Sequence, residues 1–172
     1  MTTFPRCLAT AAVLSCAALV TLSAHAADDR EAAGWHKWAD FTGAIVAAGL
    51  ADPFDFGAIV PACDGASGVV TGQGFQFPYW AQNIIMACRV FDTFKDVAEK
   101  TRAGVDKSYD KDSIAGMMKT ILKRERKILC RNASSASKEL GKAEPVEAEP
   151  RAQPTALALK AEMDRVMVVG NC

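Results

Sequence analysis

Residues 78–103 constrain the fold most, because they form the longest clean helical pattern in the chain. Apolar side chains recur there mostly at steps of three and four residues, the period of one helix face: Trp80, Ile84, Ala87, Cys88, Phe91, Phe94 and Ala98. Charged residues occupy the opposite face: Arg89, Asp92, Asp96 and Lys100. Pro78 suits the first turn, and Gly104 is a suitable stop after the last turn.

This helix carries several large aromatic side chains on one face, which predicts that it lies at the centre of a core. The alternative is a ligand pocket lined by the aromatic residues around its start: Phe75, Phe77, Tyr79 and Trp80.

The N-terminus has the three parts of a secretory signal peptide. Arg6 is the only charged residue before Asp28, an apolar run follows it, and Ala24-His25-Ala26 is a small-residue cleavage site. We therefore expect residues 1–26 to be removed after Ala26, which leaves a periplasmic or secreted chain. A lipoprotein modified at Cys16 is the alternative, but it would leave an apolar start to the mature chain.

The mature chain of residues 27–172 has the size of one domain with a single core. The 20 basic and 20 acidic residues of the whole chain nearly balance, and removal of Arg6 leaves a net charge close to −1. Bulk charge therefore favours neither nucleic acid nor any other charged partner.

Helical patterns continue on both sides of the central stretch. Residues 28–50 have an apolar stripe that starts at Trp35 and Trp38, and Pro53 ends it. Residues 52–61 are compatible with a short helix or an extended piece. Asp112 or Ser113 caps a further helix that runs to about Arg131, and residues 155–169 form a last short helix that ends at Gly170 and Asn171.

Two segments lack a helical pattern. Residues 64–76 hold four glycines and are expected to form a loop or short hairpin. Residues 133–154 are rich in Ala, Ser, Glu and Pro and predict a flexible acidic linker. The expected organisation is thus a helical core domain at 27–132, this linker, and a C-terminal helix at 155–172 docked by a disulfide.

Four cysteines remain after removal of the signal peptide: Cys63, Cys88, Cys130 and Cys172. An even number in an exported chain predicts two disulfides. We favour Cys63–Cys88 with Cys130–Cys172, because both bonds close local loops and the linker leaves Cys172 free to move. Cys88–Cys130 between adjacent helices is the main rival. The favoured pairing would also draw the acidic linker towards the basic helix before it.

The sequence offers little catalytic chemistry, and we expect no catalytic residue, cofactor or metal site. His36 is the single histidine of the mature chain, and Asp40 one turn later could orient it, although a packing or surface role is more common. The carboxylate pairs Asp52 with Asp55 and Asp110 with Asp112 fit helix caps better than acid–base catalysis.

The clearest functional feature is the basic side of the helix expected at 112–131: Lys119, Lys123, Arg124, Arg126, Lys127 and Arg131. It is compatible with a solvated face partly neutralised by the acidic linker, with docking of an acidic protein partner, or with binding to anionic lipid headgroups. Nucleic acid is not expected in an exported protein whose basic face lacks interleaved aromatics.

These features predict an all-α fold, a small bundle of four to five helices with a glycine-rich loop and two disulfides. The expected function is non-catalytic binding of a protein partner in the cell envelope, as in an inhibitor or immunity protein or an accessory subunit. The alternative is a carboxylate-type hydrolase that acts on an envelope polymer.

Overall fold

A computed structural model describes residues 10–51, 54–72, 74–103 and 113–172. These parts of the chain form an all-α bundle without strands, as predicted. The helices are α1 (Thr10–Gly49), α2 (Phe56–Gly72), α3 (Tyr79–Gln82), α4 (Ile84–Ala103), α5 (Ile114–Thr120), α6 (Lys123–Leu140) and α7 (Ala152–Gly170).

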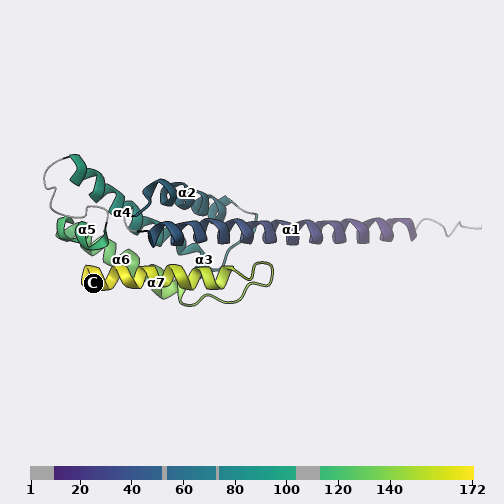
Figure 1. Cartoon of the computed structure of the whole chain (residues 1–172). Helices are drawn as coiled ribbons and strands as arrows, with labels where there is room; N and C mark the ends of the chain where they lie inside the picture. The colour runs from purple at the N-terminus through teal and green to yellow at the C-terminus, as the bar shows by residue number, and fades with distance from the viewer. Residues whose placement is uncertain (1–9, 52–53, 73, 104–112) are drawn as a thin grey trace, which may run out of the picture.

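The bundle is built along the C-terminal half of α1 (Figure 1). Helices α2 and α7 both pack against α1, α4 packs against α2 and α6, and α6 packs along α7. The N-terminal half of α1 extends well beyond the other helices (Figure 1). Among the described side chains of α1, the first large buried one is Trp35. The core therefore begins several residues after the expected cleavage position at Ala26.

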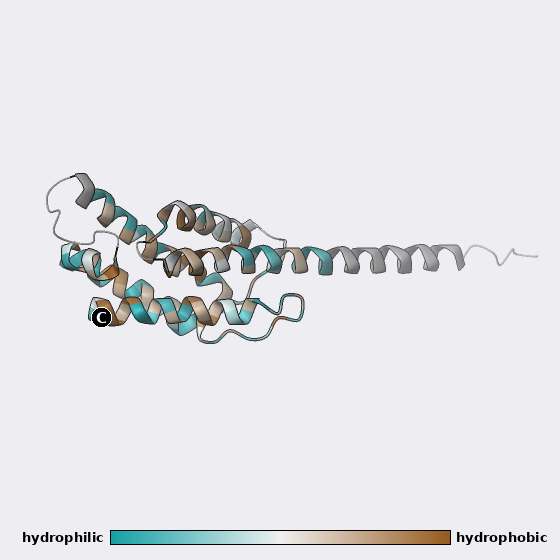
Figure 2. Cartoon of the chain, viewed as in Figure 1, coloured by the Kyte–Doolittle hydropathy of each residue, from teal (hydrophilic) through white to brown (hydrophobic). Residues whose placement is uncertain are grey.

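Aromatic side chains from three segments form one end of the core. The Trp35 ring lies 4.8 Å from Phe77 and 5.5 Å from Trp80, and Trp38 also contacts Trp80 at 5.5 Å. Trp38 Nε1–H donates to the buried carbonyl of Ala81 at 3.0 Å. Apolar and hydrophilic residues alternate along α4, α6 and α7 (Figure 2), so each of these helices can bury one side and solvate the other.

The prediction that residues 64–76 form a loop is wrong for residues 64–72, which belong to α2. A β-carbon on Gly65 would lie 2.4 Å from the Phe41 ring, so the missing side chain lets α2 approach α1. Pro61 lies inside α2 and removes one backbone hydrogen bond. Burial of five α2 side chains offsets these poor propensities: Ile59, Ala62, Cys63, Ala66 and Val69.

Two predicted helices are each divided, which gives seven helices in the described residues where four to five were expected. Asn83 separates α3 from α4, and its buried side-chain amide donates to the Tyr79 carbonyl at 2.9 Å. Ile121 and Leu122 adopt extended conformations and separate α5 from α6. The predicted cap is confirmed at Ser113, whose side chain accepts from Gly116 N–H at 3.1 Å. Gly104, the expected stop of α4, lies outside the described residues.

The prediction of a linker after residue 132 is wrong for residues 133–140, which complete α6. Their small apolar residues face the bundle, since Ala133, Ala136 and Leu140 are fully buried. The following residues 141–151 contain turns, yet they include the buried Ala143 and Glu149. The division into core domain, linker and terminal helix stays a prediction.

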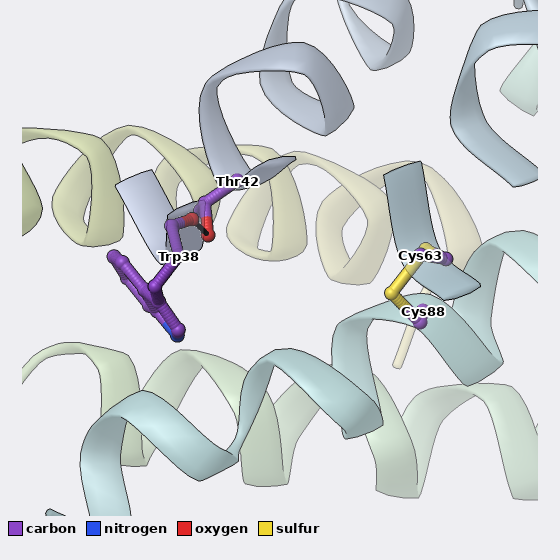
Figure 3. Close-up of a disulfide and its surroundings, with 4 residues drawn as sticks. All are labelled: Trp38, Thr42, Cys63 and Cys88. Carbon is purple, nitrogen blue, oxygen red and sulfur yellow. Dashed lines mark hydrogen bonds between the residues drawn. A yellow bond between two sulfur atoms is a disulfide. The ribbon is translucent and has the colours of Figure 1, made fainter. Parts of the chain in front are cut away.

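The predicted disulfide pairing is confirmed. Cys63 of α2 bonds to Cys88 of α4, with Cα atoms 5.6 Å apart. Figure 3 shows this bond with Trp38 and Thr42 of α1 in its surroundings. Cys130 of α6 bonds to Cys172, which follows α7, with Cα atoms 5.5 Å apart. Two such bonds indicate an oxidising, extracytoplasmic compartment. A search of the described helices finds no candidate for a membrane span.

Candidate functional site

The outward face of α6 carries a row of exposed basic residues, which Ser134 and Ser135 interrupt between Arg131 and Lys138. The buried residues Leu129, Ala133, Ala136 and Leu140 turn to the bundle. The exposed side carries five basic residues, which we call the cationic stripe: Lys123, Arg124, Lys127, Arg131 and Lys138. Fifteen residues separate its ends, so the stripe extends over about 22 Å at 1.5 Å per residue.

None of these five side chains is in an ion pair within the part of the chain that the structure describes. The expected neutralisation by residues 133–154 is therefore not found there. Glu139 pairs with Lys142 at 2.7 Å, and Glu149 pairs with His36 and Arg151. Glu139 and Glu149 thus bind other partners, and neither Glu144 nor Glu147 forms an ion pair with the stripe in the described residues.

The structure divides the six basic residues that the sequence singled out. Lys123, Arg124, Lys127 and Arg131 lie together on the stripe, whereas Lys119 is in the last turn of α5. Arg126 faces inward: its Nη2 donates to the Met118 carbonyl at 2.5 Å, and its buried Nε has no partner in the described residues. Arg126 thus supports the junction between α5 and α6 and is not part of the stripe.

Lys138 belongs to the stripe but was not predicted. The sequence interpretation ended this helix near Arg131, so Lys138 fell in the expected linker. Lys138 lies seven residues, or about two helical turns, after Arg131. This spacing could have shown that both residues share one helix face. Asn132, the first residue of a formal glycosylation sequon, is 7% exposed and faces the bundle.

A second polar cluster joins α1 to the segment before α7. Glu149 is buried and contacts Nδ1 of His36. Arg151 donates to the same carboxylate through Nε at 2.8 Å and Nη2 at 2.7 Å, and its Nη1 donates to Asp40 at 2.9 Å. Asp40, which the sequence left as a possible partner of His36, binds Arg151 instead, and Glu149 is the partner of His36.

The Arg151 guanidinium, and to a smaller extent the His36 ring, lower the pKa of Glu149 to about 2 although burial acts in the opposite direction. Glu149 is therefore ionised at neutral pH, and it accepts hydrogen bonds from both partners. This cluster fixes the position of residues 149–151 on α1. Its partners are satisfied within the fold, so its evident role is structural.

The carboxylates considered as helix caps or catalytic groups are partly described by the structure. Asp55 Oδ1 accepts from Ala58 N–H at 3.1 Å, which confirms its role as a cap of α2. Asp52, Asp110 and Asp112 lie outside the described residues. The described part of the chain contains no group of three or more His, Cys, Asp or Glu side chains that could hold a metal ion.

The four aromatic residues considered for a ligand pocket differ in their exposure. Phe77 and Trp80 are buried in the core, and Phe75 packs on Phe77 with ring centroids 4.5 Å apart. Tyr79 is 65% exposed. Core packing, the first interpretation of this region, therefore accounts for Phe75, Phe77 and Trp80.

No family model matches this chain, and comparison with curated proteins and with solved structures also finds no match. The function must therefore be argued from the geometry of the chain itself.

Proposed function

We propose that this protein is exported to the cell envelope and binds an acidic protein partner there, without catalysis, through the cationic stripe of α6. An inhibitor or immunity protein, or an accessory subunit of an envelope assembly, would act in this way. The observation that carries the proposal is the exposure of five cations on one helix face with no ion pair in the described residues. Such a surface attracts a complementary negative one and increases the rate of association.

Export is supported by two independent features. Arg6, the apolar run after it and Ala24-His25-Ala26 have the order of a cleavable signal peptide. The two disulfides suit an oxidising compartment, which the envelope provides. Removal after Ala26 would also spare the bundle, because the first large buried side chain described in α1 is Trp35.

An acidic protein fits this surface better than an anionic membrane does. The apolar face of α6 is buried against α4 and α7, so it is not available for insertion into lipid. The whole chain carries equal numbers of acidic and basic residues, so its net charge gives no long-range attraction to a negative membrane. A protein partner requires only local complementarity along the stripe.

The test compares two double charge reversals in the exported chain. Lys127→Glu with Arg131→Glu reverses the middle of the stripe, and Lys37→Glu with Arg89→Glu makes the same change in net charge on exposed positions of α1 and α4. We expect wild type and the α1/α4 variant to co-purify the same acidic protein from envelope extracts. The stripe variant should lose it while its circular dichroism spectrum and melting temperature stay close to those of wild type.

Equal recovery of the partner with both variants would contradict the proposal. Binding to vesicles of anionic lipid that depends on Lys127 and Arg131 would instead assign the stripe to the membrane. Mass spectrometry of the purified chain tests export separately, because processing after Ala26 removes residues 1–26.

A further inference from the structure

A small hollow lies directly beside the cationic stripe, between α4 and α6. It has a volume of about 110 Å³ and is lined by Thr93 and Asp96 of α4 and by Glu125 and Ile128 of α6. Ile128 lies four residues after Arg124 and three before Arg131. Residues three and four apart are neighbours on a helix surface, so these two arginines and the hollow form one continuous surface.

The hollow offers one exposed aliphatic side chain, Ile128, for contact with an apolar group of a partner. Ile128 keeps 37% of its surface exposed, although it is a large aliphatic residue. The Thr93 hydroxyl donates to the Arg89 carbonyl at 2.8 Å, so its hydrogen bond is already made within α4. The volume of about 110 Å³ leaves room for the end of one branched aliphatic side chain next to Ile128.

The two carboxylates that line the hollow, Asp96 and Glu125, restrict the orientation of an acidic partner. Glu125 is paired with Lys100, with Nζ and Oε1 3.1 Å apart, which reduces its repulsion. Asp96 stands on α4 near other carboxylates: burial raises the pKa of Asp92, and Asp64 and Asp96 raise it further. An acidic segment is therefore repelled at the α4 edge of the hollow and attracted at the α6 edge.

We infer that the hollow at Ile128 and the neighbouring Arg124, Lys127 and Arg131 together bind an acidic protein segment that inserts one aliphatic side chain. The carboxylates of that segment lie on the α6 side of its aliphatic residue. This inference rests on the proposed function and defines the partner that the stripe recognises. Protein interfaces commonly combine one apolar anchor in a pocket with a polar rim, and the anchor supplies most of the affinity.

The experiment uses the full oxidised chain and two synthetic peptides. Both peptides carry the same glutamates along one side, and they differ only in a central leucine or glycine. Calorimetric titration should give about tenfold tighter binding for the leucine peptide, the effect expected of one anchor side chain. Equal affinity of the two peptides for the wild-type chain would overturn the inference.

Two variants then locate the leucine preference without any change of charge. Thr93→Leu fills the hollow and Ile128→Ala removes its one aliphatic lining side chain, so each should abolish most of the preference. Val168→Ala is the matched control, since Val168 is 80% exposed on α7, and it should leave the preference unchanged. A preference that survives both Thr93→Leu and Ile128→Ala would place the anchor elsewhere and overturn the inference.

The same titrations separate this inference from the proposed function. If both peptides bind equally and Lys127→Glu with Arg131→Glu abolishes both, then only the anchor is wrong. If that charge reversal leaves the affinities unchanged, then the stripe is not the binding surface and the proposed function fails as well. Circular dichroism of each variant shows whether it is folded.

Discussion

Glu149 lies buried against α1 and contacts His36, a residue 113 positions earlier in the chain. Arg151 holds the same carboxylate through two further hydrogen bonds and reaches Asp40 on α1. A buried carboxylate is costly unless it is fully paired, so this contact fixes residues 149–151 at one place on the bundle. The start of α7 follows directly, which makes the contact a determinant of how α7 docks on α1.

Removal of the Arg151 side chain should therefore destabilise the fold. Arg151→Met leaves the buried Glu149 carboxylate without its two side-chain hydrogen bonds from Arg151, and we expect the free energy of unfolding to fall by more than in any exposed control. Arg89→Met changes an exposed arginine of α4 and should stay within about 0.5 kcal/mol of wild type. Urea denaturation followed by circular dichroism measures both. A loss no larger for Arg151→Met than for Arg89→Met would mean that the cluster contributes little.

The pKa of Glu149 gives a pH dependence with a definite sign. Its pKa is about 2 in the folded chain and near 4.5 when unperturbed, so the unfolded state takes up the proton first as pH falls. Its contribution to stability is present above about pH 4.5 and is lost between about pH 4.5 and 2. Glu149→Gln should thus be less stable than wild type at neutral pH, and the difference in unfolding free energy should shrink near pH 3. If the difference in unfolding free energy between Glu149→Gln and wild type stayed constant from neutral pH to about pH 3, the low pKa of Glu149 in the folded chain would be contradicted.

Two glycines of α2 should respond oppositely to alanine. A β-carbon at Gly65 would meet the Phe41 ring at 2.4 Å, whereas nothing lies within 4 Å of one at Gly68. Gly65→Ala should cost about 1–3 kcal/mol through overpacking. Gly68→Ala should stabilise α2 by up to about 1 kcal/mol, because glycine is the poorer helix former. The midpoints of thermal unfolding give the order, and equal shifts would show that α2 can move away from α1.

Removal of each disulfide should lower the stability by a different amount, and the order should be opposite to the order expected from loop length alone. The bonds close loops of 25 and 42 residues, for which chain entropy gives about 3.5 and 4 kcal/mol. Cys63 and Cys88 are each 5% exposed, so their replacement by alanine also leaves a cavity. We expect the Cys63→Ala, Cys88→Ala variant to lose more stability in urea than the Cys130→Ala, Cys172→Ala variant. The reverse order would show that loop entropy dominates.

Helical periodicity predicted the fold class, and the preference for bonds that close local loops selected the correct disulfide pairing. They failed where tertiary packing outweighs local propensity. Residues 64–72 have too many glycines for an isolated helix, but contact between Gly65 and Phe41 is possible only because the β-carbon is absent. Residues 133–140 show alanine and serine where a core stripe usually shows leucine, and their burial depends on close approach to α7.

The candidate site was predicted only in part for a similar reason. Four of the six basic residues lie on the stripe, because a helical face can be read from spacing. The inward turn of Arg126 could not be predicted, since it depends on the break at Ile121 and Leu122 that exposes the Met118 carbonyl. Contact between Glu149 and His36 joins distant segments, and no local pattern indicates it.

The separation of Cys130 and Cys172 has a consequence for the order of oxidation during translocation. In a chain threaded through a membrane from its N-terminus, Cys63 and Cys88 arrive first and can be joined by the oxidase at once. Cys130 must then wait, as a reactive thiol, for 42 more residues to emerge. Early closure of Cys63–Cys88 would remove both of the thiols that could pair wrongly with Cys130, so sequential arrival in an exported chain would itself select the observed connectivity.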